Sequence, residues 1–186
     1  MDSPYFLDLQ PVGGGFIGFA GAHKEIYDRY NVSAVIPSGC QLLYGAESWK
    51  CLMGYYRLPF VESPYVVVAS QFDSYQLDMN NFWVNHTLTK QFSDLTKRGL
   101  RDVYHLPRPN NNPKIFLSWS CADHAVTLGD GFSSKRVIET IVSSDGSYPS
   151  MNVNDAVAEL YLQRPNDFQL WLDNCTSTGD PCGSGC

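Results

Sequence analysis

The sequence predicts an α/β protein in which helices cover a parallel sheet. Residues 64–76 contain the apolar run Tyr65-Val66-Val67-Val68-Ala69, which lacks the alternation of a half-exposed strand. Runs of this kind are typical of strands buried on both faces. Residues 85–105 follow with helical spacing, and residues 114–119 form a second apolar run. Strand and helix therefore alternate along the chain, as a parallel sheet requires.

Length and composition indicate one folded domain over residues 1–186 with a cysteine-rich tail at 173–186. The chain is 44% hydrophobic and carries a formal net charge of -6. This charge and the lack of a basic run argue against a nucleic-acid-binding surface. No apolar stretch approaches the roughly 20 residues that span a bilayer, so no membrane span is expected.

The elements before the first apolar run are less sharply marked. Residues 5–9 predict a short strand that begins almost at the first residue, and residues 18–30 predict a helix on which His23 is a surface or packing residue. Gly13-Gly14-Gly15 between them has two interpretations. Its backbone N–H groups could form an oxyanion hole, as in glycine-rich lipase loops. The interpretation favoured here is a flexible loop leading into the helix.

The later elements can be assigned by the same reasoning. Residues 40–51 are expected to form a polar loop closed by a disulfide, and residues 85–105 a helix with a solvated charged face. Residues 107–113 are rich in proline and asparagine and predict a loop. A last amphipathic helix is expected at 154–163, before the tail.

Six cysteines indicate an oxidising compartment. An even count with a clustered tail predicts disulfides, whereas zinc is disfavoured because no histidine lies near the tail. No cofactor is expected. The first residues lack the basic start and apolar core of a signal peptide, which disagrees with secretion unless the sequence begins within the fold. The cysteines expected to form disulfides are Cys40, Cys51, Cys121, Cys175, Cys182 and Cys186.

Two candidate catalytic residues each follow an apolar strand. Asp73 comes after residues 65–69, and about fifty residues later His124 comes after residues 114–119, in the order acid then histidine that α/β-hydrolases use. In such a triad the acid orients the imidazole, and the imidazole takes the proton of the serine and returns it to the leaving group. The spacing therefore indicates an acid–base pair.

Short sequence motifs strengthen this interpretation. Residues 2–8, Asp-Ser-Pro-Tyr-Phe-Leu-Asp, are similar to the segment SDAGFFLD of the pectin acetylesterase and Notum family of secreted carboxylesterases. Residues 64–76 resemble that family's TPLFILNAAYDSWQ segment, and residues 120–124 resemble SCFAH. The tail from Trp171 is similar to the ending of plant pectin acetylesterases, whereas residues 40–51 look closer to Notum. By this resemblance Asp73 is the triad acid and His124 the base.

The resemblance also implies what the chain lacks. The family's serine lies in an upstream Gly-Cys-Ser-Ala-Gly-Gly elbow, and no Gly-x-Ser-x-Gly occurs in this sequence. The expectation is the C-terminal part of an α/β-hydrolase fold, an incomplete domain of about three parallel strands with helices. Such a chain is expected to be inactive alone, because Ser70, Ser74, Ser118 and Ser120 are not in a strained elbow.

The expected substrate is an acetylated polysaccharide such as pectin, and the alternative is a fatty acyl group on a secreted protein. A chain without a nucleophile could also be a non-catalytic binding fragment, or could pair with a separately encoded N-terminal half. The family resemblance and the cysteines both favour an extracellular location.

Overall fold

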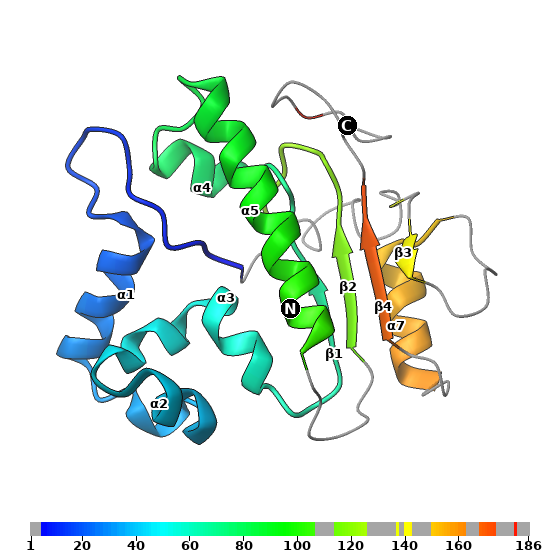
Figure 1. Ribbon diagram of the computed structural model, residues 1–186, viewed down its shortest axis with the longest axis horizontal. Helices are drawn as coiled ribbons and strands as arrows, with labels where there is room; N and C mark the ends of the chain where they lie inside the picture. Colours follow the sequence, from blue (N-terminus) through cyan, green and yellow to red (C-terminus); the bar gives the residue numbers. More distant parts are fainter. Residues whose placement is uncertain are drawn as a thin grey trace.

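The fold is built on one mixed sheet, seen in a computed structural model that describes residues 5–106, 114–125, 137, 140–142, 150–162, 168–173 and 181. The strands are β1 (Tyr65–Val68), β2 (Lys114–Ser118), β3 (Thr140–Val142) and β4 (Phe168–Leu172), in the order β1-β2-β4-β3. β1, β2 and β4 run parallel, and β3 is antiparallel to β4. The predicted α/β class, with three parallel strands and helices, is confirmed (Figure 1).

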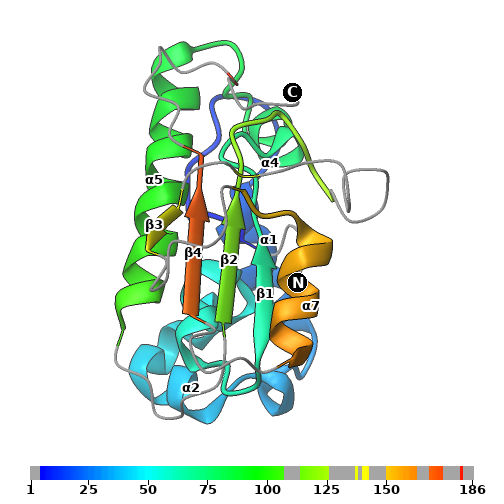
Figure 2. The same cartoon turned by 90° about the vertical axis from the view of Figure 1, so that its right-hand side faces the viewer.

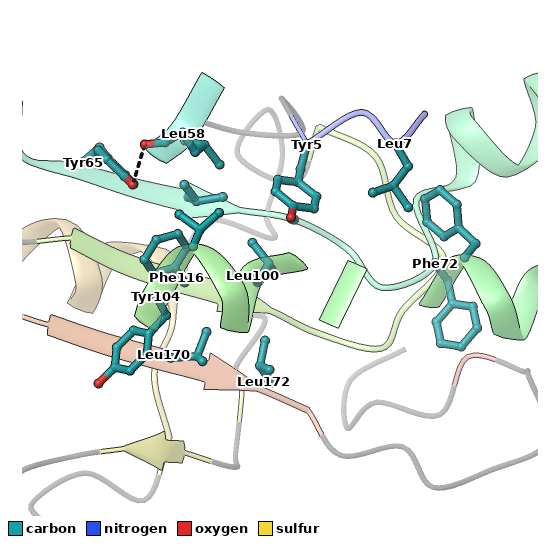
Figure 3. Close-up of a cluster of buried hydrophobic side chains, with 14 of the residues drawn as sticks. Tyr5, Leu7, Leu58, Tyr65, Phe72, Leu100, Tyr104, Phe116, Leu170 and Leu172 are labelled. Carbon is teal, nitrogen blue, oxygen red and sulfur yellow. Dashed lines mark hydrogen bonds between the residues drawn. The ribbon is translucent and has the colours of Figure 1, made fainter. Parts of the chain in front are cut away.

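Helices cover both faces of the parallel strands. α5 (His86–His105) packs on one face, where Val67, Phe116 and Leu170 belong to the same buried cluster as Phe92 and Leu100 of the helix (Figure 3). α7 (Val153–Leu162) packs on the other face, against the cluster that contains residues 66, 68, 115, 117 and 171 (Figure 2). Because successive side chains of a strand point to opposite faces, an unbroken apolar run supplies both clusters.

α5 forms where the sequence predicts it. The side chain of Asn85 caps its first turn by accepting from the N–H of Thr87 at 2.9 Å, an arrangement that satisfies one free donor. Its solvated face carries Asp94, which pairs with Lys90 at 2.5 Å and with Lys97 at 3.3 Å. The apolar stripe of the helix thus faces the sheet, and charged residues on its exposed face form ion pairs with one another.

The segment before β1 is a helical layer (Figure 1). The disulfide between Cys40 and Cys51 is present, with a Cα–Cα distance of 6.1 Å, and closing a loop of this size contributes about 3 kcal/mol in the chain-entropy model. The expectation that residues 40–51 form a polar loop is wrong, however, because this segment is helical. Leu42 and Leu43 of this segment are exposed, so its apolar residues do not form the buried stripe by which a helix is predicted from a sequence. The elements are α1 (Gly18–Arg29), η1 (Ser33–Val35), α2 (Ser38–Tyr44), η2 (Gly45–Leu52), α3 (Gly54–Arg57) and η3 (Leu58–Phe60).

Residues 5–9 do not form the predicted strand and belong to no helix or strand. The side chain of Gln76 takes the place of a strand partner: its Nε2 donates to the carbonyl of Tyr5 at 3.2 Å, and its Oε1 accepts from the N–H of Leu7 at 3.1 Å. Burial nevertheless alternates here as it would in a strand, since Tyr5 and Leu7 are both buried. The third parallel strand is instead β4, which was not among the strands predicted from the sequence.

The parallel strands end at one edge of the sheet, and α4 (Ser74–Met79) begins there (Figure 2). The carboxyl-terminal edge is where α/β sheets bring loop residues from different strands together. None of the helices in the described ranges has the length and apolarity that a bilayer crossing demands.

Candidate active site

Asp73 lies directly beyond β1 and caps α4. Its Oδ1 accepts from the backbone N–H of Gln76 at 2.9 Å, which is the N-cap bond of that helix. The side chain is almost completely buried, with 3% of its surface exposed. The carboxylate is therefore held by the backbone in one orientation, with its other lone pairs directed at the loop that follows β2.

His124 meets this carboxylate from that loop. Its Nδ1 lies 3.0 Å from Asp73 Oδ2 and 3.1 Å from Asp73 Oδ1. The histidine side chain is 32% exposed, ten times more than its partner. An Nδ1–H donated to a carboxylate fixes the tautomer in which Nε2 is the basic nitrogen. The pair thus has a buried orienting acid and an accessible imidazole.

This arrangement suits acid–base catalysis. A buried carboxylate stabilises the imidazolium that forms when Nε2 takes a proton, and the imidazolium can then protonate a leaving group. Both residues predicted from the sequence are therefore brought together, by two loops whose strands are neighbours in the sheet.

Three of the serines near the pair are hydrogen-bonded to other groups or buried. Ser70 Oγ donates to the carbonyl of Cys121, and Ser120 Oγ donates to Gln71 Oε1 at 3.1 Å. Ser118 Oγ is buried. Within the described residues, the His124 ring forms hydrogen bonds to Asp73 and to no serine. The nearby serines therefore do not complete a triad here.

A row of aromatic side chains extends from the His124 ring toward α1. Tyr75 lies beside His124 with ring centroids 5.0 Å apart, and Phe19 lies 5.7 Å from Tyr75. Phe6 and Phe16 both pack against Phe19, with ring centroids 4.8 and 5.0 Å from it. We call Tyr75, Phe19, Phe6 and Phe16 the aromatic row. Of its members, the exposed Tyr75 lies against the imidazole, and the buried Phe19 packs behind it.

The remaining candidates are distributed as follows. Gly13, Gly14 and Gly15 are exposed ahead of α1, with open space around each. Cys121 is disulfide-bonded, whereas Cys175, Cys182 and Cys186 lie outside the described residues. In the parts of the chain that the structure describes, no group of three or more His, Cys, Asp or Glu side chains is arranged to hold a metal ion.

Sequence reasoning missed the polar residues that support the pair. Gln71 and Asp173 are buried and bonded to backbone groups at the starts of the two loops, and the buried Gln76 side chain is bonded to the backbone of Tyr5 and Leu7. Asp173 follows the apolar run of β4 as Asp73 follows that of β1, and this repeated pattern was a signal that could have found it.

Comparison with known proteins supplies the fold relationship. No protein-family model and no curated protein sequence matches the chain. Two solved structures of the Wnt deacylase Notum from Drosophila are similar to it. Crystal form II superimposes with a TM-score of 0.71 at 19% identity, covering 100% of this chain and 47% of that chain. Crystal form I gives 0.65 at 18% identity, covering 98% and 47%. The chain therefore has the fold of about half of Notum.

Proposed function

We propose that this chain supplies the acid and the base of a Ser-His-Asp carboxylic-ester hydrolase of the pectin acetylesterase and Notum kind. The observation that carries the proposal is the hydrogen bond between His124 Nδ1 and the buried Asp73 carboxylate at 3.0 Å, made by a histidine side chain that is 32% exposed. The shared fold with the Notum structures and the resemblance of residues 64–76 and 120–124 support it.

The nucleophile comes from a segment other than the described residues, either in a longer chain or in a separately encoded half. His124 Nε2 takes the proton of that serine as its oxygen attacks the ester carbonyl, and Asp73 stabilises the resulting imidazolium. The imidazolium gives the proton to the departing alcohol, leaving an acyl-enzyme. Water, deprotonated by the same imidazole, then releases the acid and regenerates the serine.

The first candidate substrate is an acetylated polysaccharide such as pectin, outside the cell. It is supported by the resemblance of the tail from Trp171 to plant pectin acetylesterases, and the Cys40–Cys51 disulfide supports an oxidising compartment. A small acetyl group needs little apolar surface beside the imidazole.

The second candidate is a fatty acyl group on a secreted protein. The aromatic row favours it, because the exposed Tyr75 ring lies beside His124 and offers apolar contact to a chain longer than acetyl, and Phe19 packs behind it. The structural neighbours are Wnt deacylases, which is consistent with this candidate. The two candidates differ in acyl length and can be separated by one series of esters.

The test joins this chain to a segment that carries a Gly-x-Ser-x-Gly elbow, found by extending the open reading frame upstream. We expect the joined protein to hydrolyse p-nitrophenyl acetate and to be labelled by a serine-reactive fluorophosphonate. The 186-residue chain alone should do neither. Hydrolysis by the chain alone that depends on His124 would contradict a separate nucleophile. A folded joined protein that lacks activity would leave only a binding role.

The aromatic row gives a prediction about acyl length. If it binds the acyl chain, Tyr75→Ala should lower kcat/KM for p-nitrophenyl octanoate about tenfold more than for the acetate, since each buried methylene contributes about 0.8 kcal/mol. The matched control is Tyr161→Ala, which removes an exposed tyrosine from α7 on the opposite face of the sheet. An equal loss for both esters would favour the acetyl candidate.

A further inference from the structure

A buried polar network joins the ends of the three parallel strands beneath the candidate site. It consists of Gln71, Ser120 and Asp173, and we call it the strand-end network. Gln71 Nε2 donates to the carbonyls of Ser118 at 3.1 Å and Asp173 at 2.8 Å. One side chain that follows β1 is thereby bonded to the ends of β2 and β4.

The orientation of the Gln71 amide follows from its partners. Both carbonyls can only accept, so the NH₂ group must face them and Oε1 must face the Ser120 hydroxyl. That hydroxyl donates to Oε1 at 3.1 Å. Both polar atoms of the fully buried Gln71 side chain are thus satisfied, which is the condition under which a buried network adds rigidity.

Asp173 completes the network from β4. Its Oδ2 accepts from the backbone N–H of Ser120 at 3.1 Å, and its own N–H donates to the carbonyl of Ser118 at 2.9 Å. A buried carboxylate that takes no part in the acid–base pair therefore holds the backbone at the start of the loop that carries His124.

The same two loops are bonded to each other along their length. The N–H of Gln71 donates to the carbonyl of Trp119 at 2.9 Å, and the N–H of Ser74 donates to the carbonyl of Asp123 at 3.3 Å. These bonds lie before and after Asp73 in the first loop, and both lie before His124 in the second. The strand-end network lies where the two loops leave the sheet, and Asp73 and His124 lie at the other end of the paired stretch.

We propose that Gln71, Ser120 and Asp173 are positioning residues that hold His124 Nδ1 against Asp73. The inference rests on the proposed role of that pair. A catalytic group must be held to within about 0.5 Å of its working geometry by neighbours that are themselves fixed. No residue of the network bonds the imidazole, so its effect reaches His124 through the backbone from residue 120 to residue 124.

The test observes the pair directly in the 186-residue chain, without needing turnover. In protein labelled with ¹⁵N at histidine, the Nδ1–H of His124 should give a downfield proton signal that is absent from His124→Ala. We expect Ser120→Ala and Gln71→Met to raise the solvent-exchange rate of this proton at least about tenfold, as losing a buried hydrogen bond implies. Asp173→Asn keeps an acceptor oxygen for the Ser120 N–H and should preserve the signal, whereas Asp173→Ala should not.

Thr96→Val is the matched control. It removes a buried hydroxyl that donates to the carbonyl of Phe92 at 3.0 Å within α5, away from both loops. It should lower stability and leave the His124 signal unchanged. A wild-type protein without the signal would overturn the Asp73–His124 pair and the proposed function. If the wild-type protein shows the signal and folded Ser120→Ala leaves it unchanged, the positioning role alone is overturned. If Gln71→Met does not fold, the milder Ser120→Ala variant decides between these outcomes.

Discussion

In the protein joined to its serine-bearing segment, His124→Ala should lower kcat for p-nitrophenyl acetate by about a million-fold, the loss seen when a triad histidine is removed. Without the imidazole the serine hydroxyl has no group to take its proton. KM should change far less, because the Nε2 side of the ring acts on the nucleophile. Steady-state kinetics on the folded variant measures both values.

Asp73→Asn should cost less, about ten-thousand-fold. An amide can present its NH₂ group to Nδ1, which would leave Nε2 protonated and unable to accept the serine proton. Asparagine is also a good N-cap, so the bond to the N–H of Gln76 that starts α4 can be kept. The variant therefore tests the chemistry of Asp73 with its helix cap retained.

The control for both variants is His105→Ala, which removes an exposed histidine at the end of α5. It should leave kcat within a factor of about two, as expected of a surface substitution. If folded His124→Ala kept activity within tenfold of the unchanged protein, the acid–base role of the pair would be wrong.

The pair itself was predictable because sheet geometry places residues that follow neighbouring parallel strands at one edge. Asp73 and His124 each follow an unbroken apolar run, and the structure brings them to 3.0 Å. Their catalytic role remains a proposal. The helices at residues 86–105 and 153–162 were predictable for a similar reason, since both carry an apolar stripe of helical period.

The supporting residues were not predictable from one sequence. Gln71 and Ser120 look like ordinary loop residues in the sequence. Their hydrogen-bond partners, a carbonyl of β2 and a carboxylate after β4, lie far from them along the chain. The aromatic row joins residues from three separate segments, and no local pattern relates Phe6 to Tyr75. These contacts are long-range in sequence, and local periodicity carries no information about them.

The first predicted strand shows the limit of periodicity. Tyr5 and Leu7 alternate with more exposed residues as in a strand, but in the described structure their backbone groups bond to the side chain of Gln76. Alternation records which side chains are buried, whereas a strand also needs a backbone partner. Both buried residues pack in the cluster beneath α5 (Figure 3).

Gly99→Ala should lower the free energy of unfolding by about 2 to 3 kcal/mol, although alanine is the better helix former by about 1 kcal/mol. Gly99 lies in α5 where Tyr5 and Tyr55 approach the helix. An added Cβ would overlap the Tyr5 hydroxyl oxygen and lie 2.6 Å from Cε2 of the Tyr55 ring. Those rings pack edge to face with centroids 5.7 Å apart, and Tyr5 is buried in the core, so admitting the Cβ requires the core around Tyr5 to repack. Denaturant unfolding monitored by far-UV circular dichroism measures the change.

Tyr5→Phe separates the overlap from other causes. The Tyr5 hydroxyl is buried without a hydrogen-bond partner in the described structure, so removing it should be neutral or stabilising. In the double variant it also removes the nearest clash, and we expect a coupling energy of about 1 kcal/mol or more between the two substitutions. Gly21→Ala in α1 is the matched control, because the three atoms nearest its new Cβ are 3.1 to 3.3 Å away and all belong to the exposed Ile17 side chain. Additive effects of Tyr5→Phe and Gly99→Ala would show that the helix does not need glycine to admit the Tyr5 ring.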